Sequence, residues 1–227
     1  MRSCSFEQDN NDMNTFYTPV LGLVATLIMT QSIAQKTPKS IAGEYYLTGV
    51  REVGSGIKLN PDSTFEFFFA YGALDRMGKG TWKLQGDQII LNSRPKPDKD
   101  FALVKSRTVP GNQLTIRIVD TNKQLLSYIL VGVKHGADIQ QGTTNANGQV
   151  HFNKHPVDAL MLQFEFCPER FSIFQVAHKE HNDFEFRFEP WLMDVFFENL
   201  SLTLSDNALK GPHPLLDPNK SYSFQRN

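Results

Sequence analysis

The stretch Thr64–Tyr71, which reads T-F-E-F-F-F-A-Y, decides the fold expected for the first half of this chain. Phe65, Phe67, Phe69 and Tyr71 occupy alternate positions, and the side chains of a strand point to opposite faces with a period of two. All four rings are therefore expected on one face, which other parts of the chain must cover. The pattern predicts a sheet that is curled around this row of aromatic rings.

The composition of the chain also favours strands. Its 227 residues include 18 Phe, and aromatic side chains suit the pleated surface of a sheet. The length allows one large or two small domains. The formal net charge is −1 and there is no long run of Lys and Arg, so we expect no nucleic-acid partner.

The N-terminal segment has the pattern of an export signal. Val20–Met29 is an apolar run, and Ser32-Ile33-Ala34 places small residues where a signal peptidase reads them. Residues 1–34 are therefore predicted to be a signal peptide, with Met13 as a second candidate start that shortens the leader. The alternative is membrane attachment through an uncleaved segment at residues 16–34, although a span needs roughly 20 apolar residues. The mature protein is expected in the periplasm or outside the cell.

Turn signals divide the rest of the chain into short strand-like segments. A polar linker is expected at residues 35–42. The sequence V-P-G-N at 109–112 interrupts the pattern, and the alternation of apolar residues begins again after it. The sequence thus predicts one β domain at residues 43–109 and a second at residues 112–227.

Four short motifs characterise the first predicted domain: G-E-Y at 43–45, G-I-K-L-N-P-D-S-T-F at 56–65, G-K-G-T-W at 78–82 and I-I-L at 89–91. With these motifs the segment resembles the small lipocalin-like β domains of bacterial envelope proteins, such as the N-terminal domain of copper-resistance lipoproteins. The resemblance implies a curled sheet or half-barrel. The paired cysteines and the lipidation cysteine of that family are absent here, so copper sensing is not implied.

Three motifs characterise the second predicted domain: L-T-I-R-I-V-D at 114–120, L-L-S-Y-I-L-V-G-V at 125–133 and T-T-N-A-N-G-Q-V-H-F at 143–152. This segment resembles carboxypeptidase-regulatory-like and transthyretin-like domains. The resemblance implies an antiparallel β-sandwich of roughly seven or eight strands, which serves as a structural or interaction module. Together the two resemblances are typical of exported proteins of Gram-negative bacteria of the Bacteroidetes type.

Residues with catalytic or metal-binding chemistry are sparse. Cys167 is the one cysteine outside the leader, so no internal disulfide is expected, and we predict that it is a small buried residue. His178 and His181 form H-K-E-H and are the candidates for metal ligands. A zinc site needs three or four convergent ligands, so a solvated loop is the favoured interpretation and no metal or cofactor is predicted.

No nucleophile elbow, phosphate-binding loop, dinucleotide fingerprint or H-E-x-x-H motif is present in the sequence. The chain is therefore expected not to be an enzyme, and no catalytic residue is predicted. An enzyme that uses His178, His181 or Glu169 between the two domains is the least favoured hypothesis.

Two hypotheses for function remain open. The favoured one is an exported, non-enzymatic β-domain protein with a binding or interaction role in the cell envelope, whose partner is an unidentified protein or envelope component. The alternative is a carrier that holds an apolar small molecule in the first domain. Its candidate ligand-binding residues are the rings of Phe65, Phe67, Phe69, Tyr71 and Trp82. A void of several hundred Å³ lined by these rings would favour the carrier, and a filled interior would favour the interaction module.

Overall fold

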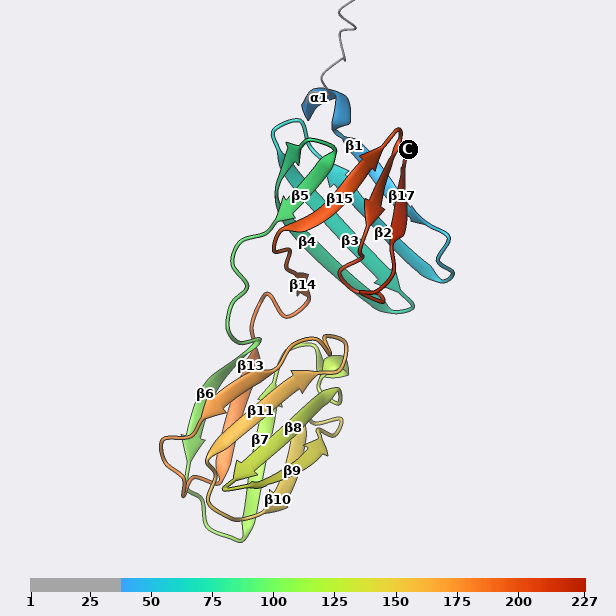
Figure 1. Ribbon diagram of the computed structural model, residues 1–227. Helices are drawn as coiled ribbons and strands as arrows, with labels where there is room; N and C mark the ends of the chain where they lie inside the picture. The colour runs from blue at the N-terminus through green and yellow to red at the C-terminus, as the bar shows by residue number, and fades with distance from the viewer. Residues whose placement is uncertain (1–37) are drawn as a thin grey trace, which may run out of the picture. The chain divides into compact units, whose positions relative to one another are not determined.

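The computed structural model describes residues 38–227, which form an all-β protein (Figure 1). Residues 1–37 lie outside the described residues, and with them the predicted signal peptide, Met13 and the alternative membrane segment. Residues 38–227 belong to one compact unit. Within the described part of the chain, no helix is long and apolar enough to span a membrane.

The first body is a closed β-barrel of eight antiparallel strands. Successive barrel strands are neighbours in the sheet, and β5 pairs with both β4 and β15, which closes the sheet on itself. The predicted curled sheet is thus confirmed and proves to be a complete barrel. Its strands are β1 (Gly43–Thr48), β2 (Val53–Leu59), β3 (Thr64–Tyr71), β4 (Leu74–Gln85), β5 (Gln88–Asn92), β15 (Leu200–Ser205), β16 (Ala208–Gly211) and β17 (Tyr222–Arg226).

The second body is a β-sandwich that is inserted between β5 and β15. One four-stranded sheet has the order β10-β7-β13-β6 and the other has the order β12-β11-β8-β9. All pairs are antiparallel except β7 and β13, which run parallel. The elements are β6 (Phe101–Arg107), β7 (Gln113–Val119), the 3₁₀ turn η1 (Lys123–Leu125), β8 (Ile129–His135), β9 (Asp138–Thr143), β10 (Gln149–Asn153), β11 (Ala159–Phe164), β12 (Ser172–Gln175) and β13 (Asp183–Phe188).

The predicted division of the chain near Pro110 is wrong. β6 was assigned to the first domain, but it pairs with β13 in the sandwich. β15 and β17 were assigned to the second domain, but they pair with β5 and β1 of the barrel. The physical reason is the two open edges that β1–β5 leave. Their unpaired backbone groups need partners, and the C-terminal strands supply them.

The predicted aromatic row is confirmed at three of its four positions. Phe65, Phe67 and Phe69 are buried in the barrel core, but Tyr71 is 52% exposed. Tyr71 is the last residue of β3 and precedes the turn at Gly72, so its ring lies where the core has ended. Trp82 is also buried, and its indole N–H donates to the Asn60 carbonyl at 3.0 Å.

The predicted linker at residues 35–42 contains a structured part. Pro38–Ile41 forms the short helix α1, and Ile41 is 2% exposed within the barrel core. The Tyr45 hydroxyl donates to the Ile41 carbonyl at 2.6 Å, which fixes this segment to β1. The described part of the linker is therefore an element of the barrel.

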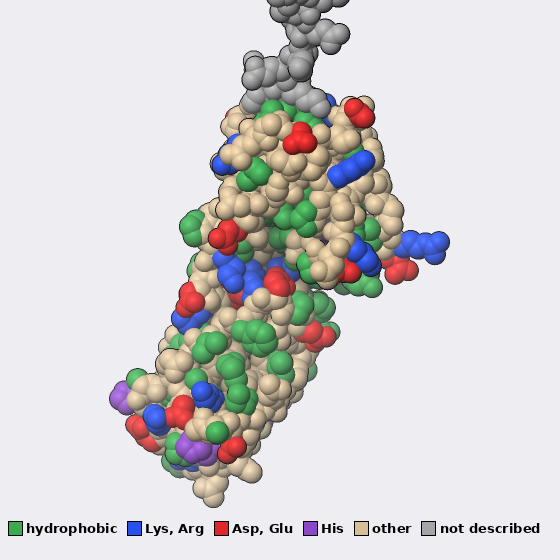
Figure 2. All heavy atoms as spheres, in the orientation of Figure 1, with side chains coloured by type: hydrophobic (Ala, Val, Ile, Leu, Met, Phe, Trp, Pro, Cys, Tyr) green, Lys and Arg blue, Asp and Glu red, His purple; other side chains and the backbone are tan. Residues whose placement is uncertain are grey.

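The sandwich has its own hydrophobic core between the two sheets, which includes Ile116, Val131, Leu162 and Phe186. Cys167 is buried in it, as predicted, and burial raises the pKa of its thiol. Figure 2 shows hydrophobic side chains on the displayed face of the sandwich as well. Ile139 on β9 and Ile173 on β12 are about half exposed.

The chain returns from the sandwich to the barrel through residues 189–199, which we call the return segment. It contains the short strand β14 (Asp194–Val195), which pairs in parallel with Met77 and Gly78 of β4. β5 pairs with β4 only at Thr81–Gln85, so β14 occupies the part of the β4 edge that β5 leaves free. The return segment thus completes the seam along which the barrel closes.

Candidate functional site: a groove on the outer face of the barrel

The described residues form a groove on the outer face of β1–β4, with a volume of about 730 Å³. The return segment and Ser93–Arg94 border it. This volume lies within the roughly 300–1,000 Å³ that is usual for small-molecule sites. The lining is mainly apolar, which suits a ligand with a hydrophobic part.

The floor of the groove is built from two neighbouring rows of residues that cross four strands. In the first row Tyr46, Gly56, Phe68 and Met77 are register partners on β1, β2, β3 and β4. The side chains of Tyr46, Phe68 and Met77 point away from the barrel core, so Phe68 is 39% and Met77 is 68% exposed. The rings of Tyr46 and Phe68 lie 6.2 Å apart. This row is an apolar shelf, a name we keep for these four residues.

The second row carries charges of alternating sign. Glu44, Lys58, Glu66 and Lys79 are register partners on the same four strands. Lys58 forms an ion pair with Glu44 at 3.5 Å, and opposite charges on adjacent strands stabilise such a row. The hydrogen bond from Tyr46 to Glu44, followed by the charge of Lys58, lowers the pKa of the Glu44 carboxyl. A ligand on the apolar shelf would therefore lie beside both cations and anions.

Gly56 makes room for the Phe68 ring on the shelf. A Cβ atom at this position would lie 2.6 Å from Cε1 of Phe68 and 3.1 Å from the Tyr45 carbonyl oxygen. The ring therefore covers the backbone of β2 only because residue 56 has no side chain. At Gly54, two residues earlier on the same strand, a Cβ would meet nothing closer than 3.8 Å.

The return segment, which forms a wall of the groove, packs closely against another glycine, Gly78. A Cβ at Gly78 would lie 2.6 Å from Cε2 of Phe197 and 2.8 Å from the Val195 carbonyl oxygen. Val195 and Phe197 are buried in the barrel core, where Phe197 packs edge-on against the rings of Phe65 and Phe67. Phe196, between them, lines the groove.

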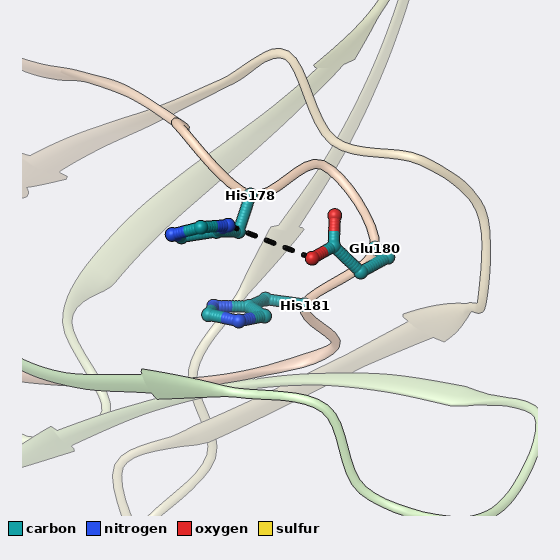
Figure 3. Close-up of side chains that lie close together, drawn as sticks. All are labelled: His178, Glu180 and His181. Carbon is teal, nitrogen blue, oxygen red and sulfur yellow. Dashed lines mark ion pairs between the residues drawn. The ribbon is translucent and has the colours of Figure 1, made fainter.

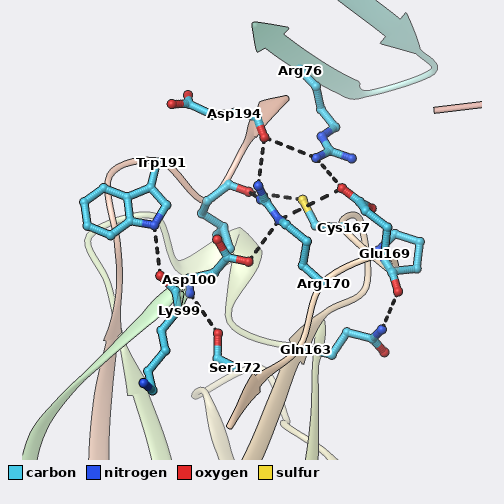
Figure 4. A network of polar contacts seen from close by, with 12 residues as sticks. Arg76, Lys99, Asp100, Gln163, Cys167, Glu169, Arg170, Ser172, Trp191 and Asp194 are labelled. Carbon is cyan, nitrogen blue, oxygen red and sulfur yellow. Dashed lines mark hydrogen bonds and ion pairs between the residues drawn. The ribbon is translucent and has the colours of Figure 1, made fainter. Parts of the chain in front are cut away.

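A polar network in the sandwich fixes the return segment (Figure 4). The buried guanidinium of Arg170 donates to the carbonyls of Leu192 and Asp194, lies 3.0 Å from the Asp100 carboxylate, and lies 5.7 Å from the Phe196 ring. The indole N–H of Trp191 donates to the Lys99 carbonyl at 2.9 Å. The connection that leaves the barrel at residues 93–100 and the return segment are thus joined to each other and to Arg170.

Arg76 extends this network to β4. Its buried guanidinium donates to Glu169 at 2.7 Å. Burial alone would raise the pKa of Glu169, but the hydrogen bond and charge of Arg76, together with a backbone hydrogen bond and the charge of Arg170, outweigh it and lower that pKa. Glu169, which the least favoured hypothesis treated as catalytic, therefore has a structural partner.

The predicted ligand-binding residues lie mostly on the other side of the sheet from the groove. Phe65, Phe69 and Trp82 pack in the barrel core, and Phe67 is the one member of the predicted set that also borders the groove. The rings of Phe67 and Phe69 contact His213 with centroid separations of 5.7 and 5.6 Å. Phe67 and Phe69 thus pack against another ring of the barrel core.

The pair most similar to a catalytic dyad is Ser55 and His213, whose Oγ and Nε2 atoms lie 3.1 Å apart. The Ser55 hydroxyl donates its one proton to the Phe68 carbonyl at 2.8 Å, and the Leu215 N–H donates to Nδ1 of His213 at 3.1 Å. Nε2 must then carry the imidazole proton and donate it to Ser55. The imidazole cannot take a proton from Ser55 in this arrangement, so the pair is not that of an activated nucleophile.

His178 and His181, the predicted metal candidates, lie in the loop between β12 and β13, as expected. The structure brings them together with Glu180, so that one potential ligand atom from each of the three residues lies within 4.8 Å of the others. Glu180 is a third potential ligand, which was not among the residues predicted from the sequence.

Apart from Phe67, sequence reasoning missed the residues of the groove, because the two rows that form its floor belong to the face of the sheet opposite the aromatic row. Phe68 interrupts the polar side of β3, and Gly56 lies opposite it on β2. An exposed aromatic residue paired with a glycine was the available signal. No local sequence pattern indicates that the return segment borders the groove, because this depends on the pairing of β14 with β4, which are far apart in the sequence.

Comparisons with known proteins give no match to a protein family and no significant match to a curated protein or a solved structure. The fold itself defines the class: an up-and-down barrel of eight strands with a β-sandwich inserted before its last three strands. The barrel of this protein has a groove on its outer surface, one wall of which is the segment that returns from the insertion.

Proposed function

We propose that the protein is an exported, non-enzymatic binding protein that holds a neutral or zwitterionic amphiphile in the outer groove of its barrel. One observation carries this proposal: an apolar shelf and a row of alternating charges lie side by side in a groove of about 730 Å³. The apolar part of the ligand lies on Tyr46, Phe68 and Met77, and its polar group lies over the charged row.

The charges of the groove support a ligand without net charge. Its cationic side chains are Lys58, Lys79 and Arg94, and its anionic side chains are Glu44, Glu66 and Asp194. Two ion pairs, Lys58 with Glu44 and Arg94 with Asp194, join members of the two sets. An anionic or cationic ligand would meet its own sign as often as the opposite one, whereas a zwitterionic group finds partners for both of its charges.

A binding role is also supported by the state of the reactive side chains. The Ser55 hydroxyl already donates its hydrogen to the Phe68 carbonyl. Burial raises the pKa of the Cys167 thiol, which disfavours the nucleophilic thiolate. Export is supported by the apolar run Val20–Met29 and the small residues before Gln35. An amphiphile is a ligand available to a protein in the cell envelope.

The test is a calorimetric titration of the mature chain with dodecylphosphocholine below its micelle concentration. The expected result is saturable binding of one molecule, and weakening by about tenfold in a Phe68→Ser variant, which corresponds to ~1.4 kcal/mol. Tyr71→Ser is the matched control, because Tyr71 lies on the same strand and is exposed but does not line the groove.

Two outcomes would contradict the proposal. One is the absence of saturable binding to the unmodified protein. The other is equal weakening by Phe68→Ser and Tyr71→Ser, which would place the ligand elsewhere. Dodecyl sulfate and dodecyltrimethylammonium, titrated in the same way, test the charge argument, since both are expected to bind more weakly than the zwitterion.

A further inference from the structure

The loop between β12 and β13 contains a turn that places two imidazoles next to each other. The His181 N–H donates to the His178 carbonyl at 3.0 Å, so these residues begin and end a single tight turn. Their rings stack with centroids 4.9 Å apart and planes inclined by 26°. The arrangement H-K-E-H therefore brings its two histidines to the same side of the turn, as Figure 3 shows.

Glu180 completes a set of three potential ligands. Figure 3 shows its carboxylate turned toward the two rings, and its Oε1 lies 3.6 Å from Nδ1 of His178. The ligand atoms of all three residues lie within 4.8 Å of one another. Two imidazoles and one carboxylate, with a position left for water, are a ligand set of open zinc sites.

Residues next to the turn hold His181 and the turn itself in place for metal binding. His181 Nδ1 lies 3.0 Å from the Ser106 hydroxyl on β6. When Nδ1–H donates to Ser106, the lone pair of Nε2 is left for a metal, which is how hydrogen-bonded histidines usually ligate. The turn is also tied to residues 157–158, because Val157 N–H donates to the Lys179 carbonyl and the Lys179 ammonium pairs with Asp158 at 2.5 Å. The one cation of the turn is thus neutralised by Asp158.

We propose that this turn is a binding site for a divalent transition metal ion of the zinc type, ligated by His178, Glu180 and His181, with Ser106 as a positioning residue. Imidazole ligands favour zinc, copper and nickel over calcium and magnesium. The site lies in the inserted sandwich, and it is independent of the proposed amphiphile site on the barrel.

The experiment is a calorimetric titration of the metal-free mature chain with zinc chloride. The expected result is one zinc ion per chain, with affinity lowered at least about tenfold in each of His178→Ala and His181→Ala. Ser106→Ala is expected to weaken binding by about tenfold, because it removes only the hydrogen bond to the ligating ring. His151→Ala is the matched control, because His151 is an exposed histidine of the same sandwich that lies on β10.

A second measurement locates the ion directly. The imidazole signals of His178 and His181 in nuclear magnetic resonance spectra are expected to shift on addition of one equivalent of zinc, while those of His151 stay in place. The proposal is overturned if the unmodified chain binds no zinc, if both alanine variants bind as tightly as the unmodified chain, or if His151 responds in their place.

Discussion

His213 and Ser55 are 158 residues apart in the sequence, and their side chains meet with 3.1 Å between Nε2 and Oγ. His213 follows β16 near the C-terminus, whereas Ser55 lies on β2. Both are almost completely buried, and the His213 ring stacks on Phe224 at a centroid distance of 5.8 Å. A neutral imidazole therefore serves as a core ring that also makes two hydrogen bonds.

This arrangement predicts a loss of stability in mild acid. Burial lowers the pKa of His213 from 6.5 to about 4 in the folded protein. As the pH falls below 6.5, the His213 side chain binds a proton in the unfolded chain but stays neutral in the folded chain. The free energy of unfolding therefore decreases until the pH reaches about 4. The full contribution is about 3 kcal/mol. Urea denaturation at a series of pH values between 7.5 and 4 measures it.

His213→Phe tests the assignment of that pH dependence. The variant keeps an aromatic ring in the core but has no group that titrates, so the decrease between pH 6.5 and 4 is expected to become smaller by about 3 kcal/mol. His151→Phe, at an exposed position, should leave the decrease unchanged. An unaltered pH profile in the His213→Phe protein would rule out this histidine as the cause.

A pair of glycine substitutions on β2 tests the shape of the apolar shelf. Gly56→Ala places a methyl group where the Phe68 ring lies, so the ring must move, and binding of dodecylphosphocholine is expected to weaken about fivefold, or ~1 kcal/mol. Gly54→Ala meets no close atom and should leave the affinity as it is. Calorimetric titration of both proteins makes the comparison, and equal affinities would show that the ligand does not rest on this ring.

Arg170 is expected to be the residue of the polar network on which stability depends most. Arg170→Met leaves the Asp100 carboxylate buried without its partner and removes the donors to Leu192 and Asp194, with an expected cost of about 3–5 kcal/mol. Burial already raises the pKa of Asp100, although Arg170 opposes this shift. Chemical denaturation followed by circular dichroism gives the free energy of unfolding.

Arg187→Met is the matched control for this substitution. Arg187 pairs with Glu189 at 3.5 Å, but its side chain is 52% exposed, so its removal is expected to change the stability by less than about 1 kcal/mol. If both substitutions had the same small effect, the network around Arg170 would not be what holds the return segment.

Processing of the N-terminus provides a prediction from the sequence alone. When the full chain is expressed in a Gram-negative host, the exported protein is expected to begin at Gln35, because Ala34 ends the small-residue motif. Intact-mass measurement of the periplasmic fraction determines the first residue. Recovery of the uncut chain from the membrane fraction would instead support attachment through residues 16–34.

Local patterns allowed much of the strand content to be predicted. The alternation of Phe65, Phe67 and Phe69 identified β3 and its buried face, and the turn at Asn60–Ser63 marked where that strand begins. The expected all-β architecture with a curled sheet and a sandwich is confirmed. These features depend on side-chain periodicity over a few residues, which a sequence displays directly.

The partners of the strands were decided only in the tertiary structure. Leu200–Ser205 and Tyr222–Arg226 read as strands, but nothing near them indicates that they pair with β5 and β1 across an insertion of about a hundred residues. Backbone hydrogen bonds are the same for every strand, so the choice of partner depends on closing all edges and filling one core. The groove followed from that choice, because its wall exists only once residues 194–196 have returned to β4.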